Sequence, residues 1–125
     1  MATDFPAIVE ALKAVFSKYE KKLDVKADSR MGYMLTSRLP SPFPQHKGQP
    51  MFFGAVRTGK AYVSFHLVPL YMSPELDATV SPALLKRRQG KSCFNFKSVP
   101  DAELLTELKA LTKAGFDQWK EKKWL

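Results

Sequence analysis

The sequence predicts an α+β domain in which an antiparallel sheet carries the N- and C-terminal helices on one face. Two amphipathic stretches, residues 5–23 and 98–119, show the three- and four-residue apolar spacing of helices. Between them, β-branched and aromatic runs separated by Gly- and Pro-containing turns are typical of antiparallel strands. The 125 residues provide one core, so we expect a single domain over residues 1–125.

The first helix is predicted over residues 5–23. Its apolar stripe consists of Phe5, Ile8, Val9, Leu12, Val15, Phe16, Tyr19 and Leu23. Asp4 is a suitable N-cap, and Pro6 fits the first turn because a missing N–H costs nothing there.

Two short strands are predicted between Val25 and Ser37, joined by a turn near Ser29 and Arg30. The next 13 residues, 38–50, contain four prolines and Gly48, which excludes a helix or an inner strand. We therefore predict a loop, which is either functional or a stiff connector.

A hairpin with arms 51–57 and 60–67 is the clearest strand signal, and a two-residue Thr58-Gly59 loop would pair Arg57 with Lys60. Strand alternation then assigns Phe52, Gly54, Val56, Ala61, Val63, Phe65 and Leu67 to the core face. The opposite face, which we expect to be partly open, carries Met51, Phe53, Ala55, Arg57, Lys60, Tyr62, Ser64 and His66.

Three prolines divide the chain after the hairpin into turns and a short helix over 81–88, capped by Ser81 and ended by Gly90. A last strand over 92–97 points Phe94 and Phe96 into the core, and Cys93, Asn95 and Lys97 away from it. The final helix is expected to begin at Ser98, with Asp101 completing a capping-box spacing.

The charge is concentrated in the middle of the chain. The formal net charge is +8, and residues 29–100 hold ten Lys and Arg against only Glu75 and Asp77. This segment forms the expected open face, so an anionic ligand is favoured there over a cation.

We therefore predict a non-enzymatic domain whose open face binds a small anionic or aromatic ligand, or a protein partner. Arg57 and Lys60 would supply charge, Phe53 and Tyr62 a flat apolar surface, Ser64, His66 and Asn95 hydrogen bonds, with Lys91 and Cys93 at the margin. The face also allows a Cys93–His66 pair, but a lone cysteine is more often a small apolar side chain than a nucleophile.

The sequence contains no recognisable motif for metal, phosphate or nucleic-acid binding. The spacings of His, Cys and acidic residues match no zinc site or calcium loop, and no phosphate-binding glycine motif occurs, so we predict no catalytic residue, metal or cofactor. Nucleic-acid binding through Lys86, Arg87, Arg88 and Lys91 is a further alternative, although no known binding signature accompanies this run.

A single cysteine indicates a reducing compartment, and neither a signal peptide nor a run of about 20 apolar residues occurs. We expect a cytoplasmic protein with no membrane partner.

Three segments carry a resemblance to a known family: residues 62–67, 84–87 and above all 90–96, Gly-Lys-Ser-Cys-Phe-Asn-Phe. They resemble the YdhG-like family of small bacterial domains of unknown function. The resemblance extends from Phe52 to Phe116 and implies a frataxin-like fold. It also implies an alternative function, because one branch of the family has been regarded as an intracellular iron chaperone. Frataxin-like iron binding relies on an acidic ridge, whereas residues 1–28 hold five acidic and five basic side chains.

Overall fold

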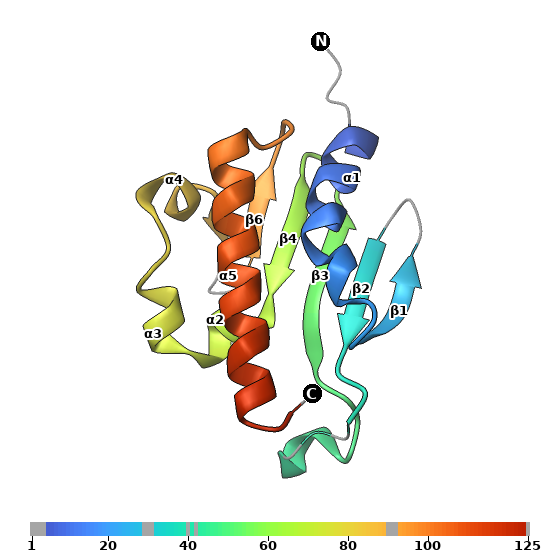
Figure 1. The fold of residues 1–125 in the computed structure, drawn as a ribbon. Coiled ribbons are helices and arrows are strands. Elements are labelled where there is room, and N and C mark those ends of the chain that lie inside the picture. Colours follow the sequence, from blue (N-terminus) through green and yellow to red (C-terminus); the bar gives the residue numbers. More distant parts are fainter. Residues whose placement is uncertain (1–4, 29–31, 40, 42, 90–92, 125) are drawn as a thin grey trace.

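The computed structural model describes residues 5–28, 32–39, 41, 43–89 and 93–124. Within this part of the chain, six strands form one antiparallel sheet in the order β1-β2-β3-β4-β6-β5 (Figure 1). The strands are β1 (Asp24–Asp28), β2 (Gly32–Thr36), β3 (Phe52–Thr58), β4 (Val63–Leu67), β5 (Arg88–Gln89) and β6 (Cys93–Phe96).

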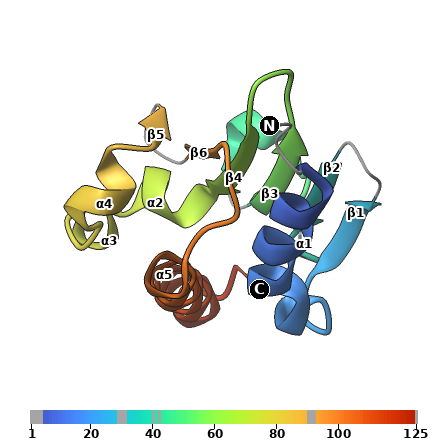
Figure 2. The same ribbon diagram turned by 90° about the horizontal axis from the view of Figure 1, so that it is seen from above.

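Helices α1 (Phe5–Phe16) and α5 (Ala102–Glu121) cover the same face of the sheet, as Figure 2 shows from above. This confirms the predicted α+β class with both terminal helices on one face. Three short helices, α2 (Val68–Met72), α3 (Pro74–Asp77) and α4 (Pro82–Leu85), lie beside the β6 end of the sheet (Figure 1). No helix in the described ranges is long and apolar enough to cross a membrane.

The core lies between the sheet and the two long helices. The predicted stripe of the first helix is confirmed, because Ile8, Val9, Leu12, Val15, Phe16, Tyr19 and Leu23 are all buried. The α-helix itself ends at Phe16 and continues as a 3-10 turn, η1 (Ser17–Tyr19). The Phe16 ring stacks on Phe65 of β4, with ring centroids 4.7 Å apart and planes 6° from parallel.

The prediction that the last helix begins at Ser98 is wrong. Asp101 is the N-cap of α5, and its side chain accepts a hydrogen bond of 2.9 Å from the Leu104 N–H. Pro100 explains the difference, because a proline disfavours the helical conformation of the residue before it and so excludes Val99 from the helix.

The predicted helix over 81–88 is correct only in its first half. Ser81 caps α4 as expected by accepting a hydrogen bond from the Leu84 N–H, but the helix ends at Leu85. The chain then forms the edge strand β5, in which Arg88 pairs with Phe94 of β6. Pairing with β6 therefore outweighs the local preference of residues 86–88 for a helix.

The predicted strands around residues 25–37 and 92–97 are confirmed as β1, β2 and β6, whose Phe94 and Phe96 are fully buried. The predicted turn at Ser29 and Arg30 lies outside the described residues. In the described part of the predicted loop over 38–50, which leaves out residues 40 and 42, the chain forms a 3-10 turn, η2 (Pro44–His46).

The hairpin forms, but with a different register. Arg57 pairs with Ser64 instead of Lys60, and residues 59–62 make a four-residue loop closed by a 2.8 Å hydrogen bond from the Gly59 N–H to the Tyr62 carbonyl. The shift by four residues preserves the alternation of faces along both arms. Ala61, predicted to be in the core, is instead exposed in this loop.

A β-bulge at the start of β3 overturns the predicted orientation of two phenylalanines. Leu35 pairs with Gly54 but Thr36 pairs with Phe52, so Phe53 is the extra residue. Phe53 is fully buried against the helices, whereas Phe52 is 54% exposed. Met51, predicted on the open face, is buried as well. Burial of the Phe53 ring outweighs strict alternation.

Candidate functional site

The sheet surface opposite α1 and α5, here called the open face, brings five of the nine predicted site residues together. Two adjoining rows of paired residues cross β3, β4 and β6: Arg57, Ser64 and Asn95 form one, and Ala55, His66 and Cys93 the other. Their neighbours along each strand point into the core, so these side chains project away from the helices.

Hydrogen bonds link Ser64, His66, Cys93 and Asn95 in these rows. The Ser64 hydroxyl donates to Oδ1 of Asn95 at 3.0 Å, and Sγ of Cys93 lies 3.5 Å from the same oxygen. Sγ also lies 3.6 Å from Nε2 of His66. Ser64 is almost fully buried, and His66, Cys93 and Asn95 are half-buried. We call Arg57, Ser64, His66, Cys93 and Asn95 the polar cluster.

Burial controls the ionisation of the cluster. It lowers the pKa of His66, and the positive charge of Arg57 lowers it further. Burial raises the pKa of Cys93, an effect that a hydrogen bond with Ser64 partly offsets. Both groups are therefore neutral near pH 7, whereas nucleophilic catalysis by cysteine needs a thiolate. The chemistry of the cluster is that of a hydrogen-bonding surface.

A cationic cavity adjoins the polar cluster where β6 ends. This basic pocket, of about 380 Å³, is lined by Tyr62, Lys86, Arg87, Arg88, Asn95 and Lys97. It lies between the β3–β4 loop, β6 and the segment from α4 to β5. Within the described part of the chain, no acidic residue lines it.

The cations of the basic pocket have different surroundings. Arg88 forms an ion pair with Asp77 of α3, so part of its charge is compensated. The guanidinium of Arg87 lies 5.3 Å from the centre of the Phe96 ring, a cation–π contact that positions it. Lys86 and Lys97 are exposed. An anion entering the pocket would meet at least three cationic side chains.

The nine predicted site residues thus lie in different surroundings. Tyr62 and Asn95 line the basic pocket, and Arg57, Ser64, His66 and Cys93 lie in the polar cluster beside it. Lys60 is exposed in the β3–β4 loop, and Lys91 lies outside the described residues. The remaining prediction, that Phe53 contributes an open aromatic surface, is wrong because the β-bulge turns its ring into the core.

The prediction of the site omitted Lys86, Arg87 and Lys97. The sequence places Lys86 and Arg87 in a short helix and in a basic run that could bind nucleic acid, and only the strand pairing of Arg88 with Phe94 brings them beside Asn95. The available signal was the basic run immediately before a short strand, although nothing local predicts that the two would pair.

The three carboxylates between residues 20 and 28 are engaged by neighbouring groups. Asp28 pairs with Lys13, Asp24 pairs with Arg38, and Glu20 accepts a 2.7 Å hydrogen bond from the Tyr33 hydroxyl. Among the residues that the structure describes, no group of three or more His, Cys, Asp or Glu side chains could hold a metal ion. The iron role implied by the family resemblance therefore stays a prediction.

Comparisons of the chain with protein-family models, curated proteins and solved structures found no significant match.

Proposed function

We propose that this chain is a non-enzymatic binding domain that holds a small anionic ligand with an aromatic portion in the basic pocket. The supporting observation is the convergence of Lys86, Arg87 and Lys97 with Tyr62 and Asn95 on one cavity of about 380 Å³. Membership of the YdhG-like family is part of this proposal, on the sequence of residues 90–96 and the order of the elements.

Each side chain has a distinct part in this proposal. The planar guanidinium of Arg87 forms two parallel hydrogen bonds with a carboxylate or phosphate, and Lys86 and Lys97 add charge. The ring of Tyr62 stacks on the aromatic portion of the ligand, and the amide of Asn95 gives a directional hydrogen bond. The neutral Cys93–His66 pair adds no reactive group.

The size of the pocket favours a small anion over a nucleic acid. A cavity of about 380 Å³ is within the range of small-molecule sites. Binding of single-stranded nucleic acid instead uses a basic groove that follows several phosphates, interleaved with stacking rings.

The test is a titration of ¹⁵N-labelled protein with phenyl phosphate, followed by amide chemical shifts. We expect saturable shifts centred on Tyr62, Arg87, Asn95 and Lys97. Arg87→Gln and Lys97→Gln should each weaken binding about five- to tenfold. Arg87→Lys should recover only part of the loss, because an ammonium group lacks the paired, planar N–H donors of a guanidinium. The matched control is Lys109→Gln, which removes the same charge from an exposed position on α5 and should leave affinity unchanged.

A parallel titration with a 12-nucleotide single strand separates the two kinds of partner. The proposal is overturned if the oligonucleotide binds with a log–log salt slope of about 2 or more, while phenyl phosphate does not bind. It is also overturned if Lys109→Gln weakens phenyl phosphate as much as Arg87→Gln does, because attraction would then reflect only net charge.

A further inference from the structure

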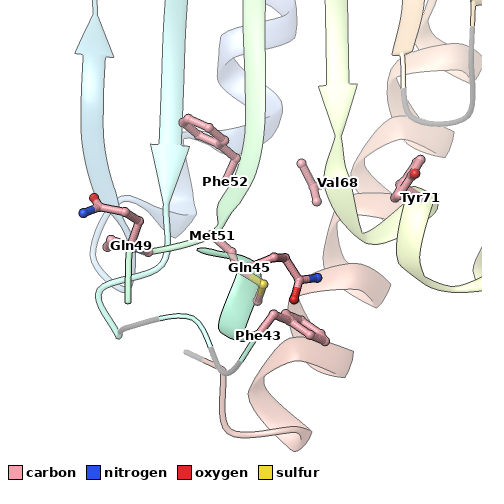
Figure 3. Close-up of a pocket in the computed structure, with 8 residues that line it drawn as sticks. Phe43, Gln45, Gln49, Met51, Phe52, Val68 and Tyr71 are labelled. Atoms are coloured by element: carbon pink, nitrogen blue, oxygen red, sulfur yellow. The ribbon is translucent and has the colours of Figure 1, made fainter. Parts of the chain in front are cut away.

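A second cavity lies at the opposite end of β4, where the strand runs into α2. This apolar pocket, of about 500 Å³, is lined by Phe43, Gln45, Met51, Phe52, Val68 and Tyr71 among others. Figure 3 shows the 43–52 segment on one side of the pocket and Val68 and Tyr71 of α2 on the other, with Phe43 and Gln45 directed toward the α2 side. No residue lines both this cavity and the basic pocket.

The β-bulge at the start of β3 creates one wall of the apolar pocket. Phe52 and Phe53 are consecutive, yet Phe53 is fully buried in the core and Phe52 is 54% exposed. Bulges commonly redirect a side chain beside a functional site. Tyr71 is 67% exposed on the opposite wall, so two aromatic rings border the cavity without being covered by the rest of the chain.

The proline-containing loop that forms the floor is held in place by specific contacts. The Ser41 N–H donates to the Gln49 carbonyl at 3.2 Å and closes the loop. Lys47 occupies the left-handed region with φ 51°, a conformation that costs free energy for a non-glycine residue and persists only in a well-determined loop. The Phe43 ring packs edge-on against Trp124, with centroids 5.5 Å apart. The pocket is therefore preformed.

The lining defines the chemistry of an occupant. Although the chain carries a net charge of +8, no charged side chain of the described residues lines this pocket. An ion entering it would lose hydration without gaining a counter-charge. The amide of Gln45 offers a donor and an acceptor, so one polar group on an otherwise apolar ligand can be satisfied.

The exposed apolar surface is small for a protein partner. A stable interface buries about 800 Å² on each side. Phe52 and Tyr71 are only 54% and 67% exposed, so covering both rings would bury less than the roughly 300–500 Å² that two aromatic side chains bury in full. A preformed cavity of about 500 Å³ matches instead the size of sites that enclose small molecules.

We propose that the apolar pocket is a second ligand site, independent of the basic pocket, that binds a small uncharged aromatic molecule carrying one hydrogen-bonding group. Phe52 and Tyr71 contact the ring from the two sides of the pocket, Val68 and Met51 complete the apolar wall, and Gln45 pairs with the polar group.

The test compares three probes of the same shape in amide-shift titrations of the full chain: p-cresol, p-toluate and 4-methylbenzylamine. We expect saturable shifts from p-cresol confined to residues 43–52 and 68–71, with at least tenfold weaker binding of the anion and the cation. Equal binding of the three probes, or shifts spread over the surface, would overturn the proposal. If p-cresol caused no shifts and the same amides shifted with protein concentration, the pocket would be a contact between two copies of the chain. That result would also overturn the proposal.

Two kinds of variant test the roles of the lining residues. Tyr71→Ala and Phe52→Ala each remove an exposed ring and should weaken p-cresol about fivefold or more, whereas Leu85→Ala removes an exposed apolar side chain elsewhere and should have no effect. Gln45→Leu should reduce the preference for p-cresol over toluene without weakening toluene. Because Tyr71 is largely exposed, its variant keeps the test valid even if Phe52→Ala disturbs β3. Arg87→Gln should leave p-cresol binding intact, and equal losses at both pockets would refute their independence.

Discussion

Sγ of Cys93 lies 3.6 Å from Nε2 of His66, yet burial favours the neutral form of both groups. We expect Cys93 to react with iodoacetamide at pH 7.5 several-fold more slowly than N-acetylcysteine, because burial raises the thiol pKa and so lowers the thiolate fraction. Replacement of His66 by Gln should not slow the reaction further. The measurement is the alkylation rate followed by intact mass. A rate above that of the model thiol that falls in His66→Gln would contradict the prediction and show that His66 activates the thiol.

The ionisation of His66 gives a second prediction. Its pKa should lie below the ordinary value of 6.5, chiefly because of burial and secondarily because of Arg57. Arg57→Gln should raise the pKa but leave it below 6.5, because the larger cause remains. Histidine ¹⁵N shifts measured against pH check this, with His66→Gln identifying the signal. A pKa at or above 6.5 in the unmodified chain would contradict the described burial of the ring.

The same shift predicts how stability depends on pH. Because the folded-state pKa of His66 is lowered, the unfolded chain binds a proton first as the pH falls below about 6.5. The contribution of His66 to stability is therefore complete above this value and is lost as the pH falls through the folded-state pKa. Urea unfolding at pH 7.0 and 5.5 should give a smaller loss of stability in His66→Gln than in the unmodified chain, and an equal loss would contradict the prediction.

The sequence predicted the fold well where a pattern extended over several turns or strands. The stripe from Ile8 to Leu23 and the alternation around Phe94 and Phe96 each contain enough apolar residues to determine a buried face. The errors lie where one contact competes with a local pattern. The bulge that buries Phe53 depends on pairing between β2 and β3, which the residues around Phe53 do not encode by themselves.

The candidate site was predictable only in part for the same reason. Ser64, His66, Cys93 and Asn95 share a face because strand alternation places them there, and the change of register by four residues preserved it. The basic pocket depends on β5, a two-residue strand too short to be recognised from sequence, which brings Arg87 beside Asn95. The apolar pocket depends on the contact of Phe43 with Trp124, residues separated by most of the chain.

Gly54 allows α1 to approach the sheet closely. A Cβ atom at this position would lie 2.4 Å from the Phe16 ring and 3.1 Å from the His66 carbonyl oxygen. The Phe16 ring cannot easily move away, because it is fully buried and stacked on Phe65. We therefore expect Gly54→Ala to lower the free energy of unfolding by about 1–3 kcal/mol, measured by urea denaturation.

Gly32 provides the matched control for Gly54 in the neighbouring strand β2. A Cβ atom there would meet only the Val56 carbonyl oxygen at 3.7 Å, an ordinary contact distance. Gly32→Ala should therefore change the free energy of unfolding by less than about 1 kcal/mol. If the two variants lost equal stability, general strand effects rather than the Phe16 contact would explain the result.

Glu107 of α5 connects the C-terminal helix to the start of α4. Its carboxylate accepts hydrogen bonds from the Ser81 N–H at 2.7 Å and from the Ser81 hydroxyl at 2.5 Å. Glu107→Ala should lower the free energy of unfolding by about 1–3 kcal/mol, because it removes a charged acceptor from a partly buried N–H. Glu103→Ala, an exposed acidic residue in the first turn of the same helix, should cost less than about 1 kcal/mol.

The contact between Glu107 and Ser81 should also matter for binding, because α4 leads directly into Lys86 and Arg87 of the basic pocket. Loss of this contact releases the segment that carries two of the proposed anion-binding cations, whereas the apolar pocket shares no element with it. Glu107→Ala should therefore weaken phenyl phosphate binding and leave p-cresol binding unchanged, as measured by amide-shift titration of both probes under conditions where the variant is fully folded. Stronger phenyl phosphate binding would instead show that removing a carboxylate near the pocket outweighs the loss of positioning, since long-range attraction would then dominate the affinity.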